Sequence, residues 1–333
     1  MKYFLRKMYF SIFASLLVII TVATTTFAWY SSNQNALISD FTIGISDSDD
    51  ASIAQLKLSI DGINFDTNLN EVSVMKAVLK QKGYNTDFMT DTSVRNEFAK
   101  LSFKNATPKD LNDLNKGFQK ITRTYSYEDT SDYLSLDLYI SIDNDKYVGL
   151  DEGVTISFQN VEMASGEDKE NLFLTPMPDH PLLGPIPQKI KVNPVNAARI
   201  GVVTYEPCER GKPEERNVNS NNIYSFSSNT PSISKDGVYN FGGINNEYNA
   251  MIEYYNSIMT PNYGSISLPR ELANREDELV YGKKIIEPKL GLTSKKMVKV
   301  RFYIWMEGWD SDCFNAILGA KSGYAIKLTT GNA

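Results

Sequence analysis

The 333-residue chain holds a single histidine, His180, and only two cysteines. A Cys₂His₂ zinc site, an H-E-x-x-H metalloprotease helix and a two-histidine metal triad all need more ligands than this chain contains. His180 lies in the run Pro176–Pro187, which has five prolines, whereas a catalytic base needs a pocket and an orienting partner. The composition therefore predicts a protein that is not an enzyme and has no resident cofactor.

Positive charge is also scarce. The chain has 34 Lys and Arg against 40 Asp and Glu, a formal net charge of -6. Binding to a phosphate backbone needs clustered basic residues, so no nucleic-acid partner is expected. With 42% hydrophobic residues, the chain can bury a substantial core, and its length suits two domains or one large β unit with insertions.

The N-terminus has the pattern of a secretory signal. Three basic residues precede an apolar run over 8–23, which at about 16 residues is shorter than a spanning helix. They are Lys2, Arg6 and Lys7. We predict a signal peptide over 1–28, cut by signal peptidase between Ala28 and Trp29, and a secreted, extracellular mature chain over 29–333. The alternative is an uncleaved signal-anchor. In both cases, this segment is the only part of the chain that we expect to contact the membrane.

Strand patterns dominate the mature chain. Apolar and polar residues alternate over 134–142 and over 298–306, and this period of two predicts strands with one buried face. Shorter strands are predicted at 41–45, 55–60, 154–158, 200–205 and 324–328. Strands that bury one face are typical of antiparallel sheets. The predicted fold is all-β, an antiparallel jelly-roll-like β-sandwich with short peripheral helices and long loop insertions.

Helical spacing and capping residues predict four peripheral helices, at 70–83, 107–117, 247–258 and 310–319. Two insertions into the sandwich are expected, at about 61–130 and 206–263. The second is rich in Asn, Ser, Gly and Tyr and includes the polar run 217–222. Such composition predicts a surface loop, and a role in binding is the alternative.

Two small sets of residues are candidates for site chemistry. Glu307, Asp310 and Asp312 could ligate a hard cation such as Ca²⁺, although acids at a helix start are also explained by the helix dipole. Cys208 and Cys313 form an even pair, so a disulfide is permitted in an exported protein. Alternatively, Cys313 is simply a small buried residue. The sequence leaves both questions open.

Three segments resemble one family. The first is A-T-T-T-F-A-W-Y-S-S-N at 23–33 with the strand I-S-D-F-T-I-G-I-S at 38–46, and the second is N-A-A-R-I-G-V-V at 196–203. The third is V-K-V-R-F-Y-I-W-M-E-G-W-D-S-D-C-F-N-A-I-L-G at 298–319, followed by Y-A-I-K-L at 324–328. Together they resemble the TasA/camelysin-like exported proteins of Gram-positive bacteria, whose signals are cut by a SipW-type peptidase.

The resemblance implies a jelly-roll subunit of a cell-surface or biofilm-matrix fibre. Its partner would be a second copy of itself, as a homopolymer, or a related matrix subunit. The N-terminal strand would complete the sheet of the neighbouring subunit, with candidate donor residues Leu37, Phe41, Ile43 and Ile45. The alternative is that this strand folds back into its own sheet.

Two further functions stay open. One is a membrane-tethered, non-catalytic surface module that binds a ligand through the 206–263 loop. The other is a hydrolase built on two carboxylates.

Overall fold

The computed structural model describes residues 36–45, 56–103, 105–121, 127–142, 154–165, 169–172, 183–184, 189–244, 272, 275, 277–279, 284–286, 292–313 and 321–332. The predicted signal segment 1–28, with its Ala28–Trp29 junction, His180 and the predicted helix 247–258 lie outside these residues. Within them, no helix has the length and hydropathy that crossing a bilayer requires.

A ten-stranded sheet is organised around β18 (Lys296–Glu307). One edge of β18 pairs antiparallel with β11 (Ala198–Tyr205), and the other pairs first with β7 (Leu134–Ile142) and then with β4 (Asn105–Pro108). The sheet is completed by β2 (Leu56–Ser59), β5 (Phe118–Ile121), β6 (Tyr127–Thr130), β12 (Cys208–Glu209), β13 (Val218–Ser225) and β16 (Glu278–Leu279). The two longest alternating patterns in the sequence thus become neighbouring strands.

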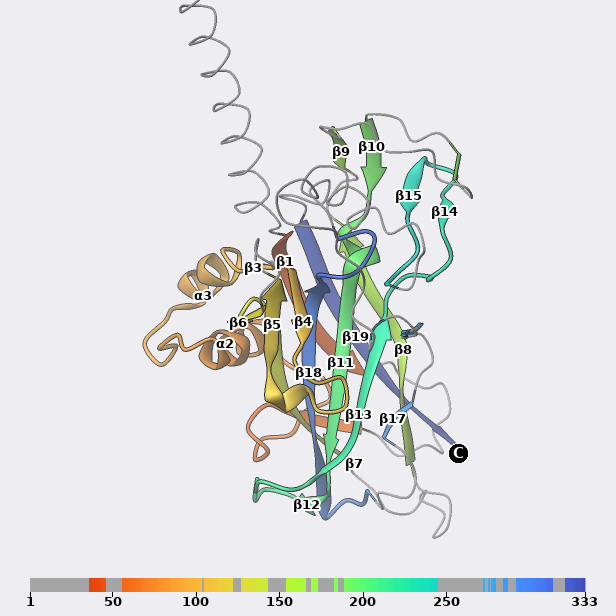
Figure 1. The fold of residues 1–333 in the computed structure, drawn as a ribbon. Helices are drawn as coiled ribbons and strands as arrows, with labels where there is room; N and C mark the ends of the chain where they lie inside the picture. The colour runs from red at the N-terminus through yellow and green to blue at the C-terminus, as the bar shows by residue number, and fades with distance from the viewer. Residues whose placement is uncertain are drawn as a thin grey trace, which may run out of the picture.

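A five-stranded sheet contains both ends of the described chain. Its central strand, β19 (Lys321–Asn332), pairs antiparallel with β8 (Val154–Ser165) and parallel with β1 (Ala36–Ile45). β17 (Lys284–Ile286) and β3 (Ser102–Phe103) form its edges. A separate four-stranded sheet joins β14 (Ser232–Ile233), β15 (Val238–Asn240), β10 (Lys189–Val192) and β9 (Lys169–Leu172), at the top of Figure 1.

The fold is all-β in its main body, but the sheets are mixed. Four strand pairs are parallel: β1 with β19, β4 with β18, β10 with β15, and β13 with β16. The expectation of purely antiparallel sheets is therefore wrong. Parallel neighbours need a long connection, and these strands are joined through long intervening segments that contain other elements.

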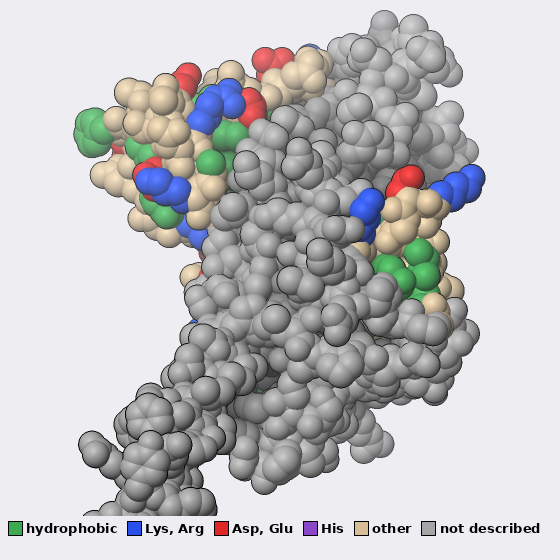
Figure 2. Space-filling model, turned by 90° about the horizontal axis from the view of Figure 1, so that it is seen from above, with side chains coloured by type: hydrophobic (Ala, Val, Ile, Leu, Met, Phe, Trp, Pro, Cys, Tyr) green, Lys and Arg blue, Asp and Glu red, His purple; other side chains and the backbone are tan. Residues whose placement is uncertain are grey.

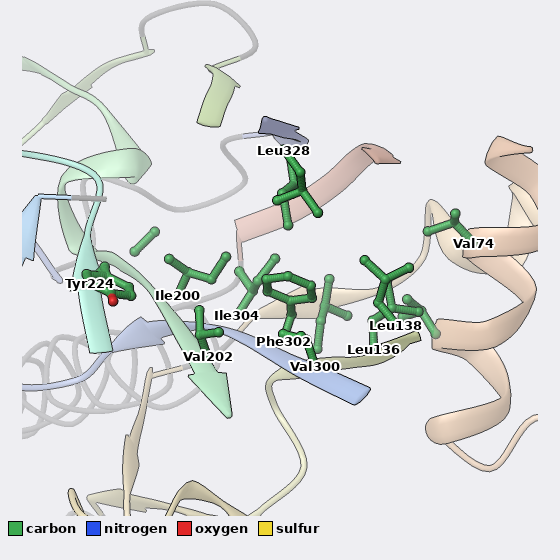
Figure 3. Packing of buried hydrophobic residues seen from close by; sticks show 14 of the residues in the cluster. Val74, Leu136, Leu138, Ile200, Val202, Tyr224, Val300, Phe302, Ile304 and Leu328 are labelled. Atoms are coloured by element: carbon green, nitrogen blue, oxygen red, sulfur yellow. The ribbon is translucent and has the colours of Figure 1, made fainter. Parts of the chain in front are cut away.

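The two larger sheets bury their facing sides in one core. Ile326 and Leu328 of β19 belong to the same buried cluster as Phe302 and Ile304 of β18 and Leu138 of β7, and Figure 3 shows Leu328 above these side chains. Each fully buried aliphatic or aromatic side chain contributes about 1.5–3 kcal/mol relative to an exposed one. This shared core positions everything described below.

Two helices close one side of the core. α2 (Glu71–Gln81) confirms the predicted helix, and its N-cap Asn70 accepts a hydrogen bond from the N–H of Ser73 at 3.2 Å. α3 (Asp91–Phe98) was not predicted; Thr90 caps it in the same way. Buried side chains from both helices, including Val74 and Phe98, join the main cluster. Figure 2, seen from above, shows basic and acidic side chains interspersed on the visible face of this helical unit.

Three sequence interpretations need correction. The predicted helix at 107–117 is instead the end of β4, a turn and the 3-10 helix η1 (Leu114–Lys116). The Asp110 side chain accepts a hydrogen bond from the N–H of Asn112, a local bond that competes with helical pairing. The predicted helix at 310–319 begins as a turn over 310–313, and its remaining residues lie outside the described chain. The polar run 217–222 lies almost entirely in β13, paired with β11, and is not a loop.

A second, smaller cluster fills the opposite face of the ten-stranded sheet. Its members are Ala106, Leu114, Phe118, Val203, Tyr205, Tyr303 and Trp305. The ring centroid of Phe118 lies 5.0 Å from that of Trp305. β11 carries glycine at position 201, where an added Cβ would lie 2.3 Å from Leu114 Cδ1 and 3.2 Å from Trp305 Cζ3. The close approach of η1 to the sheet therefore depends on Gly201.

Replacing Gly201 with alanine should lower the free energy of unfolding by about 1–3 kcal/mol, because the new methyl group overpacks this cluster. Urea denaturation measures the change. The matched control is Gly201→Ala combined with Leu114→Ala, whose cost should be smaller than the sum of the two single costs. Additive costs would contradict the proposed contact.

Candidate functional site

The three candidate metal ligands lie at the end of β18, whose last residue is Glu307, and in the turn that follows it. Glu307, Asp310 and Asp312 are fully buried. Unpaired buried carboxylates are costly, so each must be neutralised, protonated or hydrogen-bonded. Within the described residues, no group of three or more Asp, Glu, His or Cys side chains has a metal-binding arrangement. Their partners are two arginines, the side chains of Trp305 and Asn196, and several backbone N–H groups.

Arg199 is the centre of this arrangement. It belongs to β11, pairs across the sheet with Trp305, and has a side chain that is 1% exposed. Its Nε donates to Asp277 Oδ2 at 2.6 Å and its Nη2 donates to Asp310 Oδ2 at 2.5 Å. Its Nη1 donates to two backbone carbonyls, those of residues 196 and 198. All three guanidinium nitrogens thus have partners, as a buried charge requires.

Arg275 forms a second bridge. Its Nε donates to Asp277 Oδ1 at 2.7 Å and its Nη1 donates to Glu307 Oε2 at 3.1 Å. The same Glu307 oxygen accepts from Trp305 Nε1 at 3.1 Å. Asp277 therefore lies between the two guanidinium groups. The positive charge near these acids comes from arginine side chains, which pair with oxygens of Glu307 and Asp310 that a cation would also need. The candidate cation site at Glu307, Asp310 and Asp312 stays a prediction. We call Arg199, Arg275, Asp277, Glu307, Asp310 and Asp312 the ionic cluster.

Asp312 is held mainly by backbone donors. Its Oδ2 accepts from the N–H of Phe241 at 3.0 Å and of Gly242 at 3.3 Å, and its Oδ1 accepts from Asn196 Nδ2 at 3.5 Å. Burial, together with the neighbouring Asp310 carboxylate, raises the pKa of Asp312 well above its ordinary value despite these hydrogen bonds. Burial also raises the pKa of Asp310, against the opposing effect of Arg199.

Asp277 titrates in the opposite direction. Burial alone would raise its pKa, but the guanidinium groups of Arg199 and Arg275 outweigh that effect and lower it. The cluster thus combines one carboxylate kept ionised with two whose charged form is disfavoured. Both carboxylate oxygens of Asp277 and of Asp310 accept hydrogen bonds from other residues of the cluster. These are the environments of structural ion pairs.

The cluster ties distant segments together. Asp312 anchors the chain at Phe241–Gly242, and the N–H of Ser311 donates to the carbonyl of Gly243 at 3.0 Å. Glu307 and Asp310 anchor the chain at 275–277 through the two arginines. The turn over 307–313 therefore fixes the chain on both sides of residues 245–271.

The two cysteines do not approach one another. Cys208 pairs with Met297 at the start of β18, whereas Cys313 follows the far end of that strand. A 12-residue strand extends roughly 35–40 Å, but a disulfide needs Cα atoms about 4.4–6.8 Å apart. Both thiols are free and buried, so the candidate disulfide between Cys208 and Cys313 is not formed. Burial raises the pKa of Cys313 well above its ordinary value, which keeps the thiol protonated.

The candidate donor strand forms β1, which pairs with β19 of the same chain. Phe41, Ile43 and Ile45 lie opposite Tyr324, Ile326 and Leu328. The register shifts between Ile38 and Phe41, where β1 has one residue more than β19. Leu37 lies opposite Lys321, before this bulge. Its pairing with β19 is therefore offset by one residue from the pairing of the other three candidates.

One edge of β1 is largely uncovered by other strands of the described chain. β3 pairs only with Ala36 and Leu37, while β19 pairs with β1 from Leu37 to Ile45. Removal of β1 would uncover the backbone of β19 over the paired stretch, leaving N–H and C=O groups available to another strand.

Sequence reasoning missed Arg275 and Asp277 altogether and gave Arg199 no role. One signal was present: Arg199 is the only charged residue in an otherwise apolar strand, A-R-I-G-V-V. A buried arginine requires a carboxylate partner, but nothing in the pattern indicates which of the acids supplies it.

Comparison with known proteins returned no matching family model, no similar curated protein and no similar solved structure.

Arg199→Met should lower the free energy of unfolding by about 3–5 kcal/mol, because it leaves Asp277 and Asp310 buried without their shared partner. Chemical denaturation measures the loss. The matched control, Glu209→Gln, removes the exposed ion pair with Lys212 and should leave the unfolding midpoint unchanged. If Arg199→Met and the control had the same unfolding midpoint, the central role of Arg199 would be contradicted.

Asp312→Asn should change how stability depends on pH. A carboxyl group whose pKa is raised in the folded state stabilises the fold at low pH, and this contribution is lost as pH rises through the folded pKa. The asparagine side chain does not titrate. The stability of the variant relative to the native chain should therefore improve as the pH rises above the ordinary aspartate pKa of about 3.9, measured by denaturation at a series of pH values. A constant difference would contradict the raised pKa of Asp312.

Proposed function

We propose that this protein is a secreted structural subunit of a cell-surface or biofilm-matrix fibre, assembled through its N-terminal strand and without catalytic activity or cofactor. The observation that carries the proposal is the position of β1, which is held in its sheet by β19 along most of its length. The resemblance to the TasA/camelysin-like family, the jelly-roll description and the extracellular location belong to the same proposal.

Strand exchange would conserve the contacts of the single chain. If β1 of one subunit paired with β19 of the next, the same backbone hydrogen bonds would form between molecules in place of those within one molecule. Residues 46–55 separate β1 from β2, and ten residues can span about 33 Å when extended. Because the donating and accepting surfaces differ, the contact is head-to-tail and generates a filament when it does not close into a ring.

A second candidate is a membrane-tethered surface module that retains its N-terminal segment and binds a ligand through the 206–263 insertion. The ionic cluster favours it, because its hydrogen bonds hold Phe241, Gly242 and Gly243 of this insertion against the turn after β18, and binding residues are often carried on loops that a rigid scaffold positions. The pairing of β13 with β11 removes residues 218–222 from such a loop.

Negative-stain electron microscopy of the chain 29–333, beside a chain that begins at Asp47, tests the fibre. We expect filaments from the longer form only. Monodisperse particles from both forms at high concentration would overturn self-assembly and favour the tethered module. Retention of residues 1–28 in the native protein, measured by intact mass, would point the same way.

A cross-linked variant keeps β1 in place and avoids the risk that the shorter chain fails to fold. Gly44 and Lys327 are partners in the parallel register, so Gly44→Cys with Lys327→Cys should form a disulfide within one chain under oxidising conditions. The oxidised variant should remain monomeric, and reduction should restore filament growth. Filaments from the oxidised monomer would exclude exchange of β1. The single variant Lys327→Cys is the matched control.

A further inference from the structure

The ten-stranded sheet carries a pocket of about 200 Å³ at its β4–β5–β6 end. These three strands lie side by side near the end of β18 (Figure 1). Thr107 of β4 pairs with Gln119 of β5, which pairs with Asp129 of β6. Thr107 and Gln119 line the pocket, whereas Ala106 and Phe118, one position away on each strand, belong to the second hydrophobic cluster. The pocket therefore occupies the face of these strands that the cluster leaves free.

The size of the pocket limits its ligand. Pockets for drug-sized molecules usually enclose about 300–1,000 Å³, so this one suits a single ring with its substituents. Its remaining walls come from the turn after β4, from Leu272 and from Trp309. Leu272 and Trp309 lie close in sequence to Arg275 and Glu307, whose ion pair fixes both segments against the sheet.

The charges at the pocket are already balanced. Lys109 Nζ lies 2.7 Å from Asp129 Oδ1, and Asp110 Oδ2 lies 2.6 Å from Lys116 Nζ. A ligand with a strong charge would have to compete with these pairs. The pocket thus favours a neutral molecule.

The other lining groups are of two kinds. Asn112, Gln119 and Thr107 supply amide and hydroxyl groups that both donate and accept hydrogen bonds. Pro108, Leu272 and Trp309 supply apolar surface, and Tyr127, which is 44% exposed, supplies an accessible aromatic ring. A neutral ligand that presents hydroxyl groups on its edge and C–H groups on its face satisfies both sets.

We propose that this pocket binds one neutral pyranose ring of a carbohydrate. Tyr127 packs against the C–H face of the ring, and Gln119 and Asn112 hydrogen-bond its hydroxyl groups. This function is independent of strand exchange, because none of the lining residues belongs to β1 or β19.

The test is a titration of the oxidised Gly44→Cys, Lys327→Cys chain, which should stay monomeric, with methyl β-glucoside, methyl β-galactoside and N-acetylglucosamine, followed by protein NMR chemical shifts. At least one of them should bind with a Kd in the millimolar range, as expected for a single ring with few contacts. Tyr127→Ala should weaken that binding about three- to tenfold, and Gln119→Ala about three- to tenfold. The matched control Tyr84→Ala removes a comparably exposed tyrosine next to α2 and should leave the Kd unchanged.

Far-UV circular dichroism and the unfolding midpoint confirm that each variant is folded. Three outcomes overturn the proposal. The first is the absence of binding by any of the three sugars. The second is binding that neither Tyr127→Ala nor Gln119→Ala weakens. The third is glucuronate, an acidic sugar, binding more tightly than its neutral counterparts.

Discussion

The buried guanidinium group of Arg199 is the interaction on which much of the structure depends. It reaches Asp277 and Asp310, which are 78 and 111 residues away in the sequence, and Arg275 extends the bridge to Glu307. A buried charge is tolerated only when its partners are placed with good geometry. These contacts fix the turn after β18 and residues 275 and 277 relative to β11. They therefore also help to position Leu272 and Trp309, which line the pocket.

Hydrophobic burial and the ionic cluster have different roles. The core between the two larger sheets, with Phe302 and Leu328 facing one another (Figure 3), supplies most of the stabilisation, because burial is the dominant favourable contribution to folding. The cluster instead links β11, the end of β18 and residues 275 and 277 through directional hydrogen bonds, whereas hydrophobic burial is non-directional. On the opposite face of the same sheet, Gly201 permits η1 to approach, and η1 contributes Leu114 to the second hydrophobic cluster.

Much of the strand content could be predicted from the sequence, because alternation over 134–142 and 298–306 directly reflects the burial of one face. The capped helix α2 was predictable for the same kind of local reason. The predictions that failed depend mostly on contacts between residues that are far apart in the sequence. The Thr-Pro-Lys-Asp pattern at 107–110 suits a helix start and equally a strand that ends in a turn. The pairing of Arg199 with Asp277, the separation of Cys208 from Cys313, and the parallel neighbours of β18 and β19 all depend on contacts that no local pattern encodes.

The parallel pairing of β1 with β19 has a consequence for the order of folding. The partners Leu37 and Lys321 are separated by almost the whole chain. Forming this contact therefore has a large entropic cost of loop closure. During synthesis, β1 emerges long before β19, the strand with which it pairs. Each new molecule therefore passes through a stage in which β19 and β1 are both unpaired. If subunits exchange β1 as we propose, the local protein concentration at this stage decides whether the sheet closes within one molecule or between two.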